Sequence, residues 1–257
     1  MNDIQSYITT SWDDGHPLDF RIAELLSKHG LTGTFYIPRE ADAGVMPEQS
    51  IRELSKSFEI GAHTMRHVFL NTVPDAEAAR EIVDSRGWVQ DVTGNACPVF
   101  CPPGGKFSAA HLPMIERAGF QAMRSVELLS FAPPRRRGNL LIMPTTLQAH
   151  PHGLGAYVRN VLKRRALANL WLYVLHGHST DWPALARSFL DFATHHGGVF
   201  HLWGHSWEIE ANGQWERLDE VLGFMGEIKG QAPCLTNGEL CEQFRVAKSL
   251  PADAITA

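Results

Sequence analysis

The stretch SYITTSWDDGHPLDFRIAELLSKHG, residues 6–30, contains the unit from which we predict the fold. Ser6–Ser11 is short and mostly apolar on both sides, which is typical of a strand that helices bury on a parallel sheet. Asp19–His29 has apolar residues along one face and is followed by Gly30, a common residue at helix ends. The stretch therefore predicts a strand, a loop with two adjacent carboxylates, and a helix.

This order of strand, loop and helix recurs along the 257 residues, with no internal repeat and no linker. The further strands are predicted at Gly33–Ile37, Glu59–Ala62, Val99–Cys101, Gln121–Arg124, Leu140–Met143, Leu170–Leu175 and Val199–Trp203. The further helices are predicted at Pro47–Ser57, Ala76–Asp91, Ser108–Ala118, Leu154–Leu167, Trp182–His196, Trp215–Ile228 and Gly238–Lys248. About eight strands alternating with helices predict one α/β domain over residues 1–257, a (β/α) barrel with a helical extension over about 215–250. In such barrels the chemistry lies on loops that follow the C-terminal ends of the strands.

The composition excludes several classes of protein. Hydrophobic residues make up 44% and charged residues 20%, so the chain can bury a full core. A net charge of −5 does not indicate a nucleic acid or an anionic membrane as a partner. The first residues do not resemble a secretory signal, and the longest apolar run, Leu170–Leu175, is too short to cross a bilayer. We therefore expect a cytoplasmic protein without stable membrane insertion, and the oligomeric state stays open.

The cysteines give no sign of a structural metal site. The chain has four of them, and their spacings are not those of a zinc ribbon. In a cytoplasmic protein such residues are expected to be reduced thiols. This expectation applies to Cys97, Cys101, Cys234 and Cys241.

Two motifs that follow predicted strands indicate a cation. Asp13 and Asp14 follow the first strand, and adjacent carboxylates there repel each other and lose solvation when buried, unless a cation lies beside them. His63 and His67 follow the third strand, and this spacing puts both imidazoles on the same side of one helical turn. Alone, the carboxylates are also explained by a solvated turn and the histidines by chance. Together they predict a divalent ion with open coordination positions, which is typical of a catalytic site.

Two later strand ends carry further candidate residues. Gly104 and Gly105 follow two prolines, so a backbone N–H could face an oxyanion there, although a plain rigid loop explains the same residues. His205 follows the last strand and could act as a general acid, because an imidazole has a pKa of about 6.5. Trp207 and Glu208 could orient its ring or contact a sugar. A structural histidine packed against a tryptophan is the alternative.

Other histidines also fall near the predicted edge of the barrel. His16 is close enough to the two carboxylates to approach the same ion, and His176 and His178 follow the predicted strand Leu170–Leu175. The alternative is that they are loop histidines with local hydrogen bonds.

Four segments, in this order, resemble the motifs of the polysaccharide deacetylase family, the NodB-homology domain of carbohydrate esterase family 4. Trp12-Asp13-Asp14-Gly15 resembles the family's aromatic-Asp-Asp-Gly motif. His63-Thr64-Met65-Arg66-His67 matches its His-(Ser/Thr)-x-x-His motif in full. Phe100–Gly105 resembles Phe-Arg-x-Pro-x-Gly, and Leu202–Glu208 resembles a His-(Pro/Ser)-Trp-Glu form. The matches span residues 8–208, and the resemblance implies a distorted (β/α)7–8 barrel of the NodB-homology type.

The resemblance also implies a role for individual residues. Asp13 would be the general base and His205 the general acid. Zn²⁺, or another divalent transition metal, would be the cofactor, and its ligands would be Asp14, His63 and His67. The expected substrate-binding residues are Trp12, Pro103, Gly104, Trp207 and Glu208.

The third motif departs from the family pattern. Cys101 stands where the family has an arginine that pairs with the base carboxylate, and a thiol cannot replace a guanidinium. Either another cation substitutes, such as Arg66 or Arg124, or the base is tuned differently. An altered or weakened activity is therefore one expectation.

The function implied by the resemblance is removal of an N-acyl group, N-acetyl first of all, from an amino sugar of a polysaccharide or its precursor. The tryptophans near the site could stack on a pyranose ring. An amidase acting on a small ureide or formamide, as in allantoinase-like branches, is the first alternative. A carbohydrate-binding member with impaired catalysis is the second, and the replaced arginine is its main support.

Overall fold

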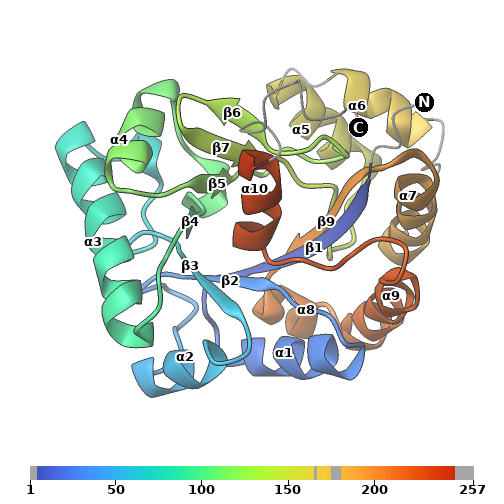
Figure 1. The fold of residues 1–257 in the computed structure, drawn as a ribbon, viewed down its shortest axis with the longest axis horizontal. Coiled ribbons are helices and arrows are strands. Elements are labelled where there is room, and N and C mark those ends of the chain that lie inside the picture. Colours follow the sequence, from blue (N-terminus) through green and yellow to red (C-terminus); the bar gives the residue numbers. More distant parts are fainter. Residues whose placement is uncertain (1–4, 165–166, 175–180, 247–257) are drawn as a thin grey trace, which may run out of the picture.

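One curled sheet of nine strands runs through the protein in this computed structural model, which describes residues 5–164, 167–174 and 181–246 (Figure 1). The strand order is β6-β7-β5-β4-β3-β2-β1-β9-β8. Neighbouring strands are parallel except β6 and β7. The sheet forms a half-barrel, which confirms the predicted distorted barrel. The strands are β1 Ser6–Asp13, β2 Thr34–Ile37, β3 Glu59–Ala62, β4 Val99–Phe100, β5 Ala122–Arg124, β6 Arg135–Arg137, β7 Leu140–Met143, β8 Leu147–Gln148 and β9 Gly198–Gly204.

Helices surround the curled sheet, and one helix lies across it (Figure 1). The outer layer packs on the sheet through a large apolar cluster that includes Ile22, Ile82 and Phe189. A second, smaller cluster joins the strands to α10 through Leu240 and Cys241. The helices of four or more residues are α1 Asp19–Lys28, α2 Glu48–Leu54, α3 Asp75–Thr93, α4 Leu112–Arg117, α5 Leu154–Arg164, α6 Leu167–Leu172, α7 Trp182–His196, α8 Ser206–Ala211, α9 Trp215–Ile228 and α10 Asn237–Val246.

Seven of the eight predicted strands are confirmed, and the strand predicted at Leu170–Leu175 is wrong. Its first residues belong to α6 and the helical path continues through Val174, while Leu175 lies outside the described residues. Asn169 and Tyr173 are buried there while Trp171 is 64% exposed, so burial follows a helical period. An apolar run without a clear period fits a strand or a helix equally well. The position beside β9 is taken by β8.

Besides α6, which had been predicted as a strand, two strands and one further helix were not predicted. In β6 all three residues are exposed arginines, so the sequence carries no burial pattern there. In β8 only two residues pair with β9, which is too short to give a period. The helix α8 directly follows β9 and begins beside His205.

In the described part of the chain, no helix combines the length and the hydropathy that a membrane span requires. The four cysteines carry no disulfide, as predicted.

His201 in β9 supplies a pH-dependent contribution to stability. Its side chain is fully buried and its Nε2 lies 2.8 Å from Ser11 Oγ. Burial, with the nearby charge of Arg124, lowers the pKa of His201 to about 3. Between pH 6.5 and about 4 the unfolded chain therefore binds a proton that the folded protein does not, so stability falls as the pH falls.

We predict that His201→Gln removes this dependence. The free energy of unfolding of the wild type should lose about 1.4 kcal/mol more per pH unit than that of the variant between pH 6 and pH 4. Urea unfolding at several pH values measures the difference between the two slopes. Equal slopes would show that His201 takes up a proton in the folded protein.

Candidate metal centre and its cavity

The two adjacent carboxylates lie at the C-terminal end of β1. Asp13 is its last residue, and Asp14 continues with its backbone N–H donating to the carbonyl oxygen of Tyr36 at 3.0 Å. Asp14 has a φ of 80°, a left-handed conformation that is uncommon for any residue other than glycine. Both side chains are buried, with exposed fractions of 3% and 5%. Such strain is typical of functional sites, because the surrounding structure must hold it in place.

The segment from His63 to His67 follows β3 and is a loop, so the prediction of one helical turn is wrong. Thr64 and His67 have φ values of 64° and 53°, which turn the chain sharply at two points. Glu81 in α3 holds this turn, because Oε2 accepts hydrogen bonds from the backbone N–H groups of Met65 and Arg66 at 2.8 and 3.0 Å. The two imidazoles therefore face one point through loop geometry.

Three potential ligand atoms converge at this point. Asp14 Oδ1 lies 3.5 Å from His63 Nε2 and 3.1 Å from His67 Nε2. Trp207 Nε1 donates to the other oxygen of Asp14 at 2.9 Å, which leaves Oδ1 directed at the histidines. Oδ1 is buried and makes no hydrogen bond to any described residue. A buried carboxylate oxygen without a partner is costly, and a cation between these atoms would remove that cost.

The charge state of Asp14 suits a metal ligand. Burial favours the neutral acid, but the contacts with His63 and His67 outweigh it and hold the pKa of Asp14 well below its usual range. His63 Nδ1 lies 2.7 Å from the carbonyl oxygen of Cys101, which can only accept, so His63 carries its proton on Nδ1. Its Nε2 is left with a lone pair toward Asp14. This arrangement is typical of a histidine that binds a metal.

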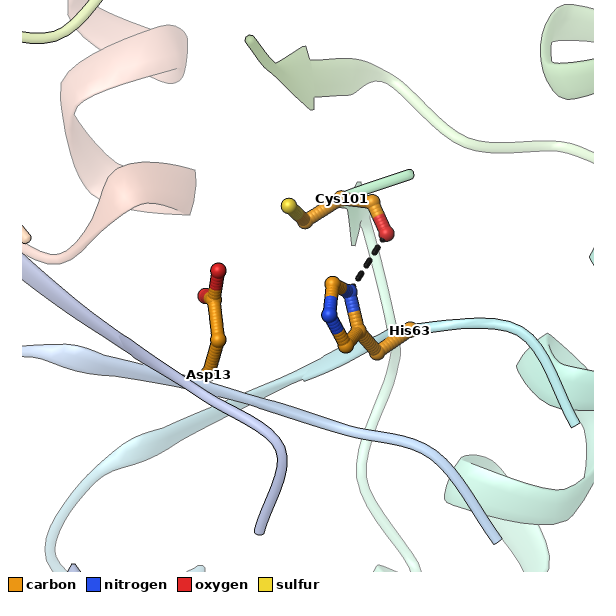
Figure 2. A group of neighbouring side chains, drawn as sticks. All are labelled: Asp13, His63 and Cys101. Carbon is orange, nitrogen blue, oxygen red and sulfur yellow. Dashed lines mark hydrogen bonds between the residues drawn. The ribbon is translucent and has the colours of Figure 1, made fainter. Parts of the chain in front are cut away.

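Figure 2 shows a second set of side chains close enough to share an ion, namely Asp13, His63 and Cys101. Burial raises the pKa of the Cys101 thiol well above its usual range, so the thiol keeps its proton. Cys101 contributes its carbonyl oxygen to His63 rather than its sulfur (Figure 2). Asp13 is already paired with a guanidinium. The set of Asp14, His63 and His67 therefore fits a divalent ion better.

Arg124 at the end of β5 supplies the cation that Cys101 cannot. Its Nη2 donates to both carboxylate oxygens of Asp13, and both side chains are buried. The guanidinium lies over the ring of Trp203, 4.7 Å from its centroid. Of the two substitutes expected from the sequence, Arg124 is therefore the one beside Asp13. Arg66 instead pairs with Glu81 and Glu77.

His205 faces the carboxylates from the end of β9. Its Nε2 lies 3.9 Å from Asp13 Oδ2 and 4.0 Å from Asp14 Oδ2. Its Nδ1 lies 2.5 Å from Glu208 Oε2, so Glu208 orients the ring. Burial alone would lower the pKa of His205, but the hydrogen bond with Glu208 and the charges of Asp13 and Asp14 outweigh it and raise the pKa to about 8.

Two of these groups, Asp13 and His205, border a cavity of about 210 Å³. Asp13, Gly104 and His205 line it together with Trp203, and the far wall comes from residues on and before α5. Gly104 has a φ of 56°, and a Cβ there would lie 3.1 Å from the ring of Phe69, so a larger residue would be strained. Pro103, which precedes it, is buried.

Two of the tryptophans predicted to contact substrate have other contacts. Trp12 is fully buried and its Nε1 donates to Thr10 Oγ1, so the prediction that it stacks on a substrate is wrong. Trp207 is bound to Asp14. A third, Trp203, borders the cavity. Successive side chains of a strand point to opposite sides. Trp12 therefore points away from the side of β1 on which Asp13 lines the cavity.

Of the remaining histidine candidates, the described part of the chain includes His16, which is not in either group of side chains that could hold an ion. His16 Nδ1 accepts a hydrogen bond from the backbone N–H of Leu18 at 3.2 Å, which is a local turn contact. His176 and His178 lie outside the described residues. Two other residues at the cavity, Gln148 and His152, were not predicted from the sequence, because Gln148 lies in a strand of only two residues and His152 lies in the segment between that strand and α5.

The curled sheet and the groups at its edge define a distorted (β/α) barrel with side chains that could hold a divalent metal. A family model described as Polysaccharide deacetylase matches residues 2–123, which include both carboxylates, both histidines and Cys101. Over these residues, just under half of the chain, the protein is similar to the polysaccharide deacetylase family. No curated protein sequence matches it significantly.

Several solved structures share this fold. A Mycobacterium smegmatis protein assigned as a polysaccharide deacetylase is 13% identical, with a TM-score of 0.66, over 98% of this chain and 94% of that one. The chitin deacetylase of the fungal pathogen Colletotrichum lindemuthianum is 15% identical, with a TM-score of 0.58, over 92% and 88%. A CE4 family pseudoenzyme from Bacillus anthracis is 16% identical, with a TM-score of 0.55, over 92% and 66%. Identities this low show a common fold, and activity has to be argued from the site.

Glu81 and Glu77 allow a matched test of the loop that carries His67. Both contact Arg66, but Glu81 is also the acceptor for two backbone N–H groups of the loop. We predict that Glu81→Gln lowers Zn²⁺ affinity about tenfold, because residues that support metal ligands typically contribute tenfold or more. Calorimetric titration with Zn²⁺ measures the change, and Glu77→Gln should differ from the wild type by less than twofold. Equal losses in both variants would assign the effect to Arg66 instead of the loop.

Proposed function

We propose that this protein is a metal-dependent hydrolase that removes the N-acetyl group from an amino sugar of a polysaccharide or of its precursor. The observation that carries the proposal is the arrangement of three groups at one edge of the sheet, where Asp13 and His205 line the cavity and Asp14 directly follows Asp13. The three groups are the set of Asp14, His63 and His67, the carboxylate of Asp13 held by a guanidinium, and the imidazole of His205. The similarity of residues 2–123 to the polysaccharide deacetylase family supports this chemistry over the ureide amidase.

Each group has a task that its surroundings support. A divalent ion such as Zn²⁺, held by Asp14 and the two histidines, would polarise the scissile carbonyl and activate water. Asp13, as base, takes the proton of the attacking water, and the ion pair with Arg124 keeps its carboxylate oriented toward the cavity. His205 carries a proton at neutral pH and gives it to the departing amine, which is otherwise a poor leaving group.

The cavity supports a small substrate group. At about 210 Å³ it lies below the range of about 300–1,000 Å³ that is usual for ligand pockets, so it admits a single amino-sugar ring while the rest of a saccharide stays outside. Trp203 offers an aromatic surface at its border. Gly104 provides the backbone at the wall that we assign to the oxyanion. We retain the prediction of a cytoplasmic location, which favours a precursor over a finished wall polymer.

We predict that acetate release from N-acetylated chitooligosaccharides depends on the proposed metal ligands. A chelator should abolish release and added Zn²⁺ should restore it. His67→Ala should lose Zn²⁺ binding and activity together, because one of three ligands is removed, whereas His195→Ala on the exposed end of α7 should change neither. Calorimetry measures the metal and an enzymatic acetate assay measures turnover.

Three outcomes would contradict this function. Full activity in the metal-free protein would exclude the proposed metal chemistry. Ammonia or formate release from ureides or formamides, with no acetate from sugars, would favour the amidase instead. Zn²⁺ and sugar binding without acetate release would favour the impaired carbohydrate-binding reading, for which Cys101 is the sequence feature.

We also predict that the position of the arginine can be exchanged between β4 and β5. Arg124→Ala leaves Asp13 buried without its partner, which should cost about 3–5 kcal/mol of stability and about a hundredfold in kcat/KM. Adding Cys101→Arg restores a guanidinium from the position that the family uses, and should recover part of both losses. Thermal unfolding and acetate release measure the two effects. Wild-type activity in Arg124→Ala would show that Asp13 needs no paired cation.

A further inference from the structure

A chain of hydrogen bonds runs from His205 to the far wall of the cavity. Glu208 Oε2 lies 2.5 Å from His205 Nδ1 and accepts from Gln148 Nε2 at 3.0 Å. Gln148 Oε1 lies 2.8 Å from His152 Nε2. The chain joins the candidate general acid to a second histidine that lines the same cavity.

The direction of each hydrogen bond follows from the chemistry of the groups. Burial raises the pKa of Glu208, but the hydrogen bond from His205 outweighs it and lowers the pKa below its usual value, so Glu208 is a carboxylate and can only accept. Gln148 must then turn its NH₂ toward Glu208, which points its oxygen at His152. That oxygen also only accepts, so His152 must carry its proton on Nε2.

The other ring nitrogen of His152, Nδ1, then carries no proton and can accept a hydrogen bond. Burial, with the nearby charge of His150, lowers the pKa of His152 to about 4, so the ring is neutral near pH 7. No described residue donates a hydrogen bond to Nδ1, and the ring packs edge-on against Tyr157 with centroids 5.7 Å apart. A neutral imidazole held in one tautomer at a cavity wall is suited to accept from a hydroxyl or an N–H of a ligand.

We propose that His152 is a specificity-determining residue whose Nδ1 accepts a hydrogen bond from a hydroxyl of the sugar substrate, with its tautomer fixed by Gln148 and Glu208. The inference rests on the proposed function for the class of ligand. In this proposal Gln148 is a positioning residue that acts through His152.

The first test separates binding from turnover. His152→Phe keeps an aromatic ring beside Tyr157 but loses both nitrogens, whereas His152→Gln keeps a donor for Gln148 and an acceptor for the ligand. With tetra-N-acetylchitotetraose and Zn²⁺-loaded protein, His152→Phe should raise KM about tenfold and change kcat less than twofold. His152→Gln should recover most of that loss. His150→Phe, a neighbouring ring that does not line the cavity, is the matched control and should keep the wild-type KM.

The second test needs no turnover. Calorimetry with the same tetrasaccharide and Zn²⁺-loaded Asp13→Asn protein should show about tenfold weaker binding when His152→Phe is added. In the free wild type, ¹⁵N NMR of labelled histidine should show His152 protonated on Nε2, and Gln148→Met should abolish this preference.

The outcomes distinguish this inference from the proposed function. Acetate release with an unchanged KM in His152→Phe would overturn the inference alone. A fall in kcat with an unchanged KM would also overturn it, because His152 would then act through the chain on His205. Binding that depends on His152 without any acetate release would overturn the proposed function and support the inference. A wild type that neither binds nor deacetylates the tetrasaccharide, or a His152 protonated on Nδ1, would overturn the inference.

Discussion

The ion pair between Asp13 and Arg124 is the constraint around which the site is arranged. Taking two charges out of water costs several kcal/mol each, and this is offset only where the geometry is good and other groups share the charge. Here one guanidinium nitrogen contacts both carboxylate oxygens, and the aromatic rings of Trp203 and Tyr36 lie 4.7 and 5.3 Å from the guanidinium carbon. The pair joins β1 to β5 across the inside of the sheet. It thereby fixes where the carboxylate at the cavity points.

The centre as a whole is assembled from elements that are far apart in the sequence. The carboxylates follow β1, the two histidines follow β3, and His205 follows β9. Parallel strands bring these ends to one edge, which is why the order of motifs in the sequence was informative. Local contacts then direct the ligand atoms at one point. Glu81 holds the loop before His67. Trp207 binds one oxygen of Asp14, which leaves the other directed at the histidines.

The sequence predicted residue types and strand ends better than it predicted side-chain directions. Seven strands and the principal helices were recoverable from apolar runs and helix-ending residues, and the candidate ligands followed from their places after strands. The prediction of a helical turn from His63 to His67 was wrong. A loop with two left-handed residues can also bring two histidines that are four residues apart to one point. The burial of Trp12 follows from strand alternation, which short motifs do not reveal. His152 and Gln148 were not predicted, since one lies in a segment without regular structure and the other in a strand of only two residues.

The helix α10 is bound to the strands that lie beside the buried ion pair of Asp13 and Arg124. Asn237 at its start accepts from Thr9 and donates to the hydroxyl of Tyr36, and its backbone N–H donates to Thr34, so one residue ties the helix to β1 and β2. The ring of Tyr36 also lies 5.3 Å from the guanidinium carbon of Arg124, and both side chains are fully buried. A segment more than a hundred residues away in the sequence thus holds one of the rings that surround the guanidinium. In energetic terms the C-terminal helix preserves the low-permittivity setting in which Asp13 and Arg124 attract each other strongly.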